Sequence, residues 1–302
     1  MHRSKTLGLM AALALWPAAI HGSTQRSATH SPQAFSGASA LEFTRQAVSF
    51  GPRPSGSEAI QKLQAYILGQ LKLRGAQVIE DSFTAQTPRG PIPMLNIIGR
   101  FPGTSGRAVV LTGHYDTKFM PGMRFVGAND GGASSGFLLE MARVLSGRPR
   151  RDDVYLVWFD GEEAIGQWSD TDGVYGSRHL ARKWASEGTL ARIKALINVD
   201  MIGDQQLGLL QELNSSASLR RLVWQVAGEL GLGRYFLSHG SAIEDDHLPF
   251  LRLGVTALDL IDFDYGPGHS YWHTQQDTMD KLSAESLQVV GAVLLEVLRR
   301  LE

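Results

Sequence analysis

An apolar run from residue 154 to residue 159 is followed closely by two consecutive carboxylates, Glu162 and Glu163. Adjacent residues of an extended chain point to opposite sides, so the two glutamates can take different roles, such as metal ligand and proton carrier. An isolated Glu-Glu pair is more often a solvated acidic turn. A functional role for this pair is favoured because other polar residues also follow apolar runs of the chain.

Strand-like and helix-like segments alternate along the sequence. We expect strands at 77–83, 95–99, 108–112, 154–159, 195–199 and 256–261, and helices at 38–49, 58–73, 137–145, 176–184, 219–230 and 284–301. This alternation predicts one α/β domain over residues 38–302, with a central twisted sheet and helices on both faces. The first two strands pair locally across a turn with Pro88, Gly90, Pro91 and Pro93, so the sheet is expected to be mixed but mostly parallel.

The first 37 residues have a different character. Arg3 and Lys5 precede an apolar run from Leu7 to Ile20, a pattern typical of a secretory signal peptide, assigned to residues 1–22. The run is short for a membrane span, so an uncleaved anchor is the weaker alternative. Residues 23–37 are rich in Ser, Thr, Gln and Ala and predict a disordered leader. We therefore expect a secreted or periplasmic protein with no stable membrane association after cleavage.

The composition excludes several kinds of function. The chain of 302 residues has no cysteine, which excludes disulfides, thiolate nucleophiles and cysteine zinc sites. With 29 basic and 30 acidic residues the formal net charge is −1, and no dense basic block is present, so no nucleic-acid partner is expected. Any metal must be held by His, Asp and Glu.

Several polar residues follow predicted strands. His114 comes after the strand at 108–112, and Asp200 after the strand at 195–199. Because ligands of open α/β sheets bind at the carboxyl ends of strands, we expect these residues to meet Glu162 and Glu163 there. Asp116 lies two residues after His114, on the same side of an extended chain, and could orient its imidazole.

Other candidates lie in loops. The glycine-rich segment 126–136 lacks the Gly-Lys-Ser/Thr ending of a phosphate loop, so Asp130 is expected either to face a cation or to cap a helix. The run from Glu244 to His247 is either a charged turn or part of a site, and His273 beside Trp272 is either a core histidine or a pocket ligand. Together, His114, Asp130, Glu163, Asp200 and His273 form a nitrogen and oxygen set suited to zinc, and Glu162 remains uncommitted.

These motifs jointly resemble the zinc aminopeptidase superfamily and, more narrowly, the glutaminyl cyclase (glutaminyl-peptide cyclotransferase) family. The narrower resemblance is carried by Phe125 to Ala128, Trp158 to Ala164 with Trp168 and Ser169, Tyr175 to Ala181, Asp245 to Leu251, and Trp272 to Thr274. It covers the chain from about Ser39 to the end. The resemblance implies a zinc-dependent catalytic domain with the zinc aminopeptidase-like fold.

The resemblance also implies a role for each matching residue. One zinc would be held by Asp130, Glu163 and His273, with Glu162 as the proton shuttle, Asp200 and Asp245 as holders of the substrate's amino end, and Trp168, Trp272 and Glu244 as substrate-binding residues. The peptide bond between Asp130 and Gly131 would be cis. Gly268 stands where the animal cyclases have an aromatic pocket wall, which leaves that part of the pocket undefined.

The activity implied is cyclisation of an N-terminal glutamine of peptides or proteins to pyroglutamate, with release of ammonia. The first alternative is an aminopeptidase with two zincs, in which His114 and Asp200 are the additional ligands. An inactive binding module on the same fold is a further alternative, disfavoured because Glu162 and all the zinc ligands are present. A monomer is expected.

Overall fold

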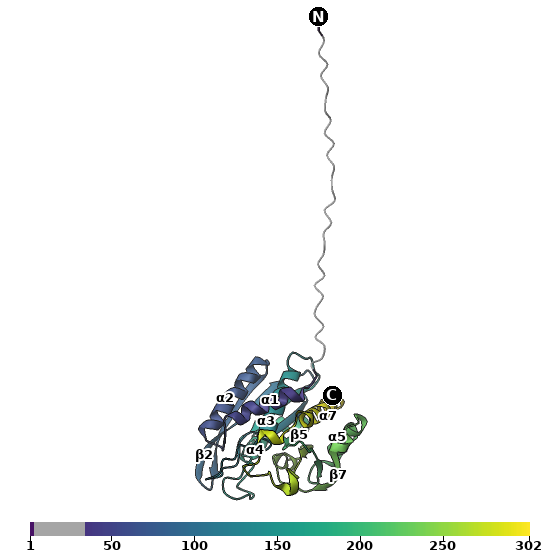
Figure 1. Ribbon diagram of the computed structural model, residues 1–302. Helices are drawn as coiled ribbons and strands as arrows, with labels where there is room; N and C mark the ends of the chain where they lie inside the picture. The colour runs from purple at the N-terminus through teal and green to yellow at the C-terminus, as the bar shows by residue number, and fades with distance from the viewer. Residues whose placement is uncertain (3–33) are drawn as a thin grey trace. The chain divides into compact units, whose positions relative to one another are not determined.

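The computed structural model describes residues 1–2 and 34–302 (Figure 1). The predicted signal peptide and leader therefore lie largely outside the described residues. Residues 34–37, expected in the leader, belong to the folded part instead. Phe35 is buried and its ring centroid lies 5.0 Å from that of Phe137, while the Ser36 side chain caps helix α1 (Gly37–Ser49) by accepting a hydrogen bond from the Ser39 amide.

The central sheet within residues 34–302 has six strands in the order β1-β2-β4-β3-β5-β8. The strands are β1 (Gln77–Thr87), β2 (Gly90–Phe101), β3 (Ala108–His114), β4 (Asp153–Phe159), β5 (Ile193–Asp200) and β8 (Ala257–Ile261). β4, β3, β5 and β8 run parallel, whereas β2 is antiparallel to both of its neighbours. The predicted mixed, mostly parallel sheet is confirmed. A small parallel pair, β6 (Leu209–Glu212) and β7 (Phe236–Ser241), was not predicted.

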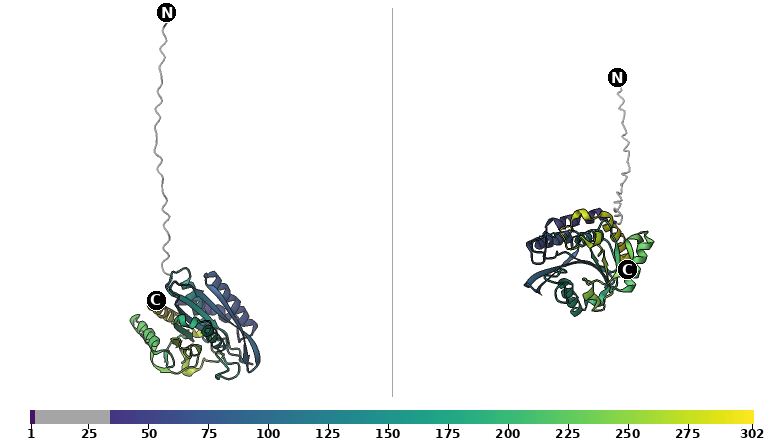
Figure 2. Two further views of the ribbon diagram at one scale, coloured as in Figure 1. Left: turned by 180° about the vertical axis from the view of Figure 1, so that it is seen from behind. Right: turned by 60° about the horizontal axis from the view of Figure 1, so that its bottom comes forward.

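Helices cover both faces of the sheet, as Figure 1 and the rear view in Figure 2 show. One face packs against α1, α2 (Glu58–Leu73), α3 (Gly132–Leu145), α5 (Ala217–Glu229) and α7 (Ala284–Leu301), and the other against α4 (Tyr175–Ser186) and α6 (Leu248–Leu251). Side chains of each strand alternate between the two cores, so Leu111 faces the first and Val110 the second. None of the helices in residues 34–302 combines the length and apolarity needed to cross a membrane.

Helix α3 begins at Gly132, five residues before the predicted start at 137. Every residue of α3 except Arg143 is buried, so its first turn shows no apolar stripe from which a helix could be predicted. Its small residues serve close packing instead. A Cβ atom on Gly136 would lie 2.1 Å from Thr44 Oγ1 of α1, so only glycine allows the two helices to approach this closely.

The hairpin of β1 and β2 is longer than predicted. Pro91 and Pro93 lie inside β2 rather than in a turn. The strand tolerates them because, among the described strands, β1 is its only neighbour over residues 90–96. Residues two apart in a strand direct their backbone N–H positions to the same edge. Proline has no N–H to donate, and both prolines lie where one edge of β2 has no partner strand. Since Ile97 is paired with Trp158, the hairpin projects past the carboxyl end of β4. There the Tyr115 hydroxyl donates to the Leu95 carbonyl at 2.6 Å, so the hairpin is fastened beside the strand ends.

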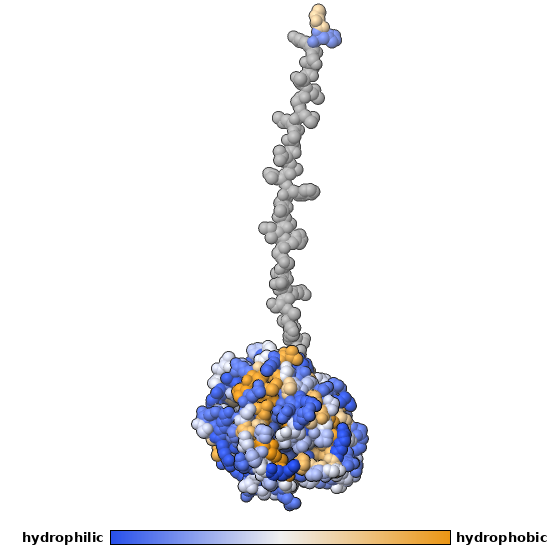
Figure 3. Space-filling view, turned by 90° about the vertical axis from the view of Figure 1, so that its left-hand side faces the viewer, coloured by the Kyte–Doolittle hydropathy of each residue, from blue (hydrophilic) through white to orange (hydrophobic). Residues whose placement is uncertain are grey.

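Figure 3 shows the side of the molecule that carries α2 and β2. Hydrophilic residues cover much of this side, with apolar patches between them. Helix α2 and the edge strand β1 each expose one large hydrophobic residue, Leu73 at the end of α2 and Ile79 in β1. The other exposed positions of β1 are polar, which protects an edge strand from pairing with another chain.

Candidate active site

The polar residues at the strand ends meet at one edge of the sheet. His114 is the last residue of β3 and Asp200 the last residue of β5, and His114 Nε2 lies 3.2 Å from Asp200 Oδ1. Glu162 follows β4 by three residues, and its Oε2 lies 3.9 Å from His114 Nδ1. The parallel order β4-β3-β5 therefore brings together side chains that are up to 86 residues apart in the sequence.

Asp130 reaches this edge from the loop before α3. Its backbone and that of Asn129 donate hydrogen bonds to the Asp277 carboxylate, at 3.2 and 2.8 Å. The structure corrects the expected cis bond after Asp130, since all described peptide bonds are trans. Gly131 makes the turn into α3 with a φ of 76°, a left-handed conformation that glycine adopts without a Cβ clash. Asp130 does not cap the helix, because Gly131 occupies the N-cap position.

Asp130, Glu163 and His273 form the first of two clusters within residues 34–302 whose ligand atoms are close enough to hold a metal ion. His273 Nε2 lies 3.0 Å from Glu163 Oε1 and 3.3 Å from Asp130 Oδ2, and the three ligand atoms lie within 4.8 Å of one another. Asp130 Oδ2 is buried and has no hydrogen-bond partner. Burial alone would lower the pKa of His273, but the two carboxylates raise it to about 9. Two carboxylate oxygens and one imidazole around a pocket fit a catalytic zinc, which takes three protein ligands and keeps one open position.

His114, Asp130 and Asp200 form the second cluster, which shares Asp130 with the first. His114 Nε2 lies 3.2 Å from Asp130 Oδ1 and from Asp200 Oδ1. Burial alone would lower the pKa of His114, but the carboxylates of Asp116, Asp130 and Asp200 raise it well above its ordinary range. The residue types of this cluster also suit zinc, so the number of metal ions does not follow from ligand types alone.

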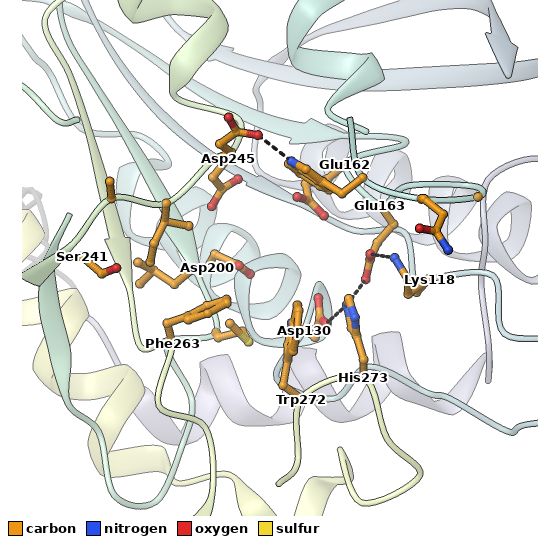
Figure 4. A pocket seen from close by; sticks show the side chains of 18 residues that line it. Lys118, Asp130, Glu162, Glu163, Asp200, Ser241, Asp245, Phe263, Trp272 and His273 are labelled. Atoms are coloured by element: carbon orange, nitrogen blue, oxygen red, sulfur yellow. Dashed lines mark hydrogen bonds and ion pairs between the residues drawn. The ribbon is translucent and has the colours of Figure 1, made fainter. Parts of the chain in front are cut away.

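Glu162 and Glu163 point in different directions, as their adjacency in the sequence suggested (Figure 4). Their backbone amides donate to the two oxygens of Asp116, at 3.1 and 3.3 Å, and Asp116 Oδ1 also lies 3.4 Å from His114 Nδ1. Asp116 therefore holds the backbone of both glutamates, and its carboxylate faces the imidazole that it was expected to orient. Burial raises the pKa of Glu162 well above its ordinary range, while the nearby His114 opposes this and Glu163 adds to it.

Further carboxyls crowd the side of the pocket opposite Glu163. Burial raises the pKa of Asp200 to about 7, a rise that His114 opposes and Asp245 increases. Burial also raises the pKa of Asp245, a rise that the nearby His247 opposes. The pKa of Asp259, a residue that the sequence did not single out, is raised well above its ordinary range by burial and by the charges of Asp245 and Asp200. Burial and mutual repulsion therefore favour protonation among these carboxyls.

These groups open into a pocket of about 570 Å³ (Figure 4). The three residues expected to bind substrate, Trp168, Trp272 and Glu244, all line it. Trp168 is 39% exposed, and its indole Nε1 donates to Glu244 Oε2 at 2.8 Å, so Glu244 fixes the position of this ring. Trp272 stacks on His273 with ring centroids 4.0 Å apart, which fixes the imidazole of the first cluster.

Among the lining residues that the sequence analysis did not single out, Phe263 and Lys118 bear most directly on the chemistry of the pocket. Phe263 lies in the pocket with its ring centroid 5.3 Å from that of Trp272 and supplies an aromatic wall beside that ring, whereas Gly268 does not line the pocket. Phe263 follows β8 by two residues, so attention to every strand exit would have found it. Lys118 also lines the pocket, and its Nζ donates to Glu163 Oε2 at 3.2 Å. No local pattern in the sequence marks Lys118.

Comparison with known proteins identifies relatives with this arrangement of elements. The sequence profile described as Peptidase family M28 matches residues 96–298. The glutaminyl-peptide cyclotransferase of Drosophila melanogaster is 32% identical over 268 residues, which cover 79% of this chain and 75% of the relative. That of Boiga irregularis is 32% identical over 321 residues, which cover 90% and 86%.

Comparison with solved structures also finds glutaminyl cyclases, together with an exopeptidase. A glutaminyl cyclase from an Acidobacteriales bacterium has a TM-score of 0.87 and 43% identity, covering 91% of this chain and 97% of the other. The glutaminyl cyclase of Porphyromonas gingivalis has a TM-score of 0.81 and 31% identity, covering 88% and 98%. A Zn-dependent exopeptidase from Parabacteroides distasonis has a TM-score of 0.80 and 27% identity, covering 89% and 99%.

Proposed function

Because this chain belongs to peptidase family M28 and to the glutaminyl-peptide cyclotransferase family, we propose that it converts the N-terminal glutamine of peptides and proteins to pyroglutamate with the help of one zinc ion. In this reaction the α-amino nitrogen forms a bond to the carbon of the γ-carboxamide. The bond from that carbon to the amide nitrogen breaks, and ammonia leaves.

The arrangement of four side chains at the pocket is the main support for the proposal. Asp130, Glu163 and His273 converge at the pocket, while Glu162 faces the same pocket without belonging to their cluster. A zinc ion held by the three ligands would supply Lewis-acid polarisation of the γ-carbonyl. Glu162 is then left as a carboxylate with no metal to hold, which is what a proton carrier requires.

Glu162 moves the protons. Starting from the α-ammonium, two protons leave the attacking nitrogen during the reaction. One is needed by the amide nitrogen to depart as ammonia, and the other is taken up by the released ammonia, so the net products are the lactam and an ammonium ion. Glu162 accepts each proton and passes it on, since nucleophile and leaving group belong to one substrate residue and lie on the same side of the pocket. The raised pKa of Glu162 supports this role, because a more basic carboxylate takes a proton from an ammonium more readily.

The remaining residues bind and orient the glutamine. Asp200 and Asp245 face the pocket from the side opposite Glu163, as Figure 4 shows, and would receive the α-ammonium of the substrate. Trp168 and Trp272 narrow the pocket and exclude water that would otherwise hydrolyse the amide. The main contribution of the protein is to hold a flexible glutamine in the folded geometry that closes the ring.

An aminopeptidase with two zincs is the second candidate. It is favoured by the second cluster, in which His114 and Asp200 face Asp130, and by the similarity to a structure named as a Zn-dependent exopeptidase. A parallel assay separates the two. Purified protein is given a peptide that begins with glutamine and a leucine anilide. We expect ammonia from the peptide and no amine from the anilide, and the reverse result would overturn the proposal.

The proposal extends to location and partners. The pattern of residues 1–22 supports export to the periplasm or the medium, where peptides and proteins with N-terminal glutamine are the substrates and the enzyme acts as a monomer. Mass spectrometry of protein from the medium or periplasm of a producing cell tests the export step. We expect a mature chain that begins near residue 23, and a full-length chain in the membrane fraction would contradict it.

A further inference from the structure

The tip of the β1–β2 hairpin lies beside residues that line the pocket or neighbour its lining. Pro88 lies beside Gly166, since a Cβ atom on Gly166 would be 3.6 Å from Pro88 Cγ. The guanidinium of Arg89, the next residue, lies over the Phe119 ring at 3.8 Å from its centroid. Gly166 lines the pocket, and so does Lys118, the neighbour of Phe119. Arg89 is therefore held next to the opening through which a bound peptide leaves the pocket.

This side of the rim is basic. Arg89 is exposed and has no ion-pair partner within residues 34–302. Neither the hairpin segment 82–95 nor the loop segment 117–128 contains an acidic residue, while together they carry Arg89, Lys118 and Arg124. The cation–π contact with Phe119 positions the guanidinium without neutralising its charge.

The interior of the pocket has the opposite charge. Glu162, Asp200 and Asp245 line it, and the proposed function assigns them the ammonium end of the substrate. A peptide bound by its first residue therefore runs from an acidic interior towards a rim with free positive charge on the side of Arg89. Charge complementarity along this path favours a peptide that is positive at its N-terminus and negative soon after it.

We propose that Arg89 is a specificity-determining residue that selects substrates with a carboxylate side chain at the second or third position, directly after the N-terminal glutamine. This inference rests on the proposed function, because it requires the glutamine in the pocket. Arg89 binds the carboxylate at the rim and takes no part in proton transfer.

The test compares peptides that differ only at position two or only at position three, with Glu, Ala or Lys there. The readout is the ratio of kcat/KM for the Glu peptide to that for the Lys peptide, because any loss common to both peptides cancels. At low salt we expect a ratio of about three to ten for the wild-type protein at one of the two positions. A larger ratio is not expected, because the interaction free energy of an exposed charge pair is small. The ratio should approach one at high salt, where such pairs are screened.

Variants assign the preference to Arg89. Arg89→Glu should bring the ratio below one, and Arg89→Lys should preserve most of it. Phe119→Leu, which removes the aromatic ring under the guanidinium, should lower the ratio part of the way. The matched control is Arg182→Glu, the same charge reversal at an exposed arginine of α4, and it should leave the ratio at the wild-type value.

The outcomes separate this inference from the proposed function. If none of the glutamine peptides is cyclised by the wild-type protein, the proposed function fails. If all are cyclised with Glu to Lys ratios near one, or if Arg89→Glu leaves the ratio unchanged, the inference about Arg89 is wrong while the proposed function stands.

Discussion

The two clusters that could hold a metal are built from the same residue types and share Asp130, yet they differ in access. In the first cluster the His273 side chain is 18% exposed, lines the pocket and is stacked by Trp272. In the second cluster the His114 side chain is 1% exposed and does not line the pocket. A metal in the first cluster can meet a substrate, whereas the imidazole of the second is enclosed by carboxylates.

We propose that this difference in access selects the first cluster for a single metal. Carboxylates of Asp116, Asp130 and Asp200 surround His114 on both ring nitrogens, and the resulting rise of its pKa favours a protonated imidazole. The carboxylates around His273 raise its pKa in the same way, so a zinc ion in either cluster would have to displace a proton from its histidine, because only the neutral imidazole is a ligand. The two clusters differ in access, and we therefore propose that the metal binds at the first cluster, which faces the pocket, and that His114 remains a hydrogen-bonded cation in the second.

The largest effect on rate is expected from Glu162→Gln, which tests the proposed role of Glu162 as proton carrier beside the first cluster. The amide keeps the size of the side chain but cannot accept the ammonium proton, so kcat should fall by about 10²–10⁴-fold. Zinc content should be unchanged, since Glu162 is outside the metal cluster. Steady-state rates and metal analysis of the same sample provide the measurement, and an active variant would show that another group carries the proton.

Matched substitutions in the two clusters, His273→Ala and His114→Ala, test the assignment of the metal. His273→Ala removes a ligand, so zinc binding should weaken by at least about 100-fold, beyond the loss expected for a supporting residue. His114→Ala should keep the zinc. Its zinc affinity should fall less, and only because His114 no longer contacts Asp130, which belongs to both clusters. Competition with a chelator measures both. Equal losses of zinc in the two variants would mean that both clusters bind metal.

Asp116→Asn should have a smaller effect on both clusters at once. Asp116 accepts the amides of Glu162 and Glu163 and faces His114, so the substitution loosens the turn that carries a ligand and the proton carrier. We expect zinc affinity or kcat to fall by about 10–100-fold. The surface substitution Asp280→Asn is the control, because its pair with Lys281 is exposed. An Asp116→Asn variant as active as this control would exclude a positioning role.

The smallest effect on catalysis is expected from Glu212→Gln, which acts on stability at a distance from both clusters. Burial alone would raise the pKa of Glu212, but hydrogen bonds from His247 and from backbone amides lower it to about 2. Because the folded pKa lies below the ordinary value, Glu212 stabilises the fold above pH 4.5 and this contribution disappears as the pH falls towards 2. The shift corresponds to about 3 kcal/mol. Denaturant unfolding at pH 7 and pH 3 should show the variant less stable at pH 7 and closer to the wild type at pH 3.

The sequence predicted most of the fold where the pattern is regular. Helix α2 was expected over the same residues that it occupies, because its apolar stripe and its cap at Ser57 are clear. The start of α3 was missed because a helix buried on all sides has no stripe. The length of β2 was missed because Pro91 and Pro93 predict a turn unless the strand is known to have an open edge.

The residues of the site were likewise predictable only where a regular sequence pattern marks them. His114, Glu162 and Asp200 could be expected together, since each follows a strand and the carboxyl ends of parallel strands share an edge. Asp245 and His273 come from long loops whose paths no local pattern predicts, so only the family resemblance placed them. Lys118 and Asp259 were missed because their surroundings are created by the folded chain, not by their sequence neighbours.

Zinc stoichiometry distinguishes one metal at the first cluster from two metals at both clusters. Purified protein is equilibrated at pH 7 with buffered free zinc, and the metal per chain is measured by elemental analysis, for the wild type and for His273→Ala. We expect about one zinc per chain in the wild type and almost none in His273→Ala. Two zinc ions per wild-type chain, or one retained by His273→Ala, would exclude a single metal at the first cluster.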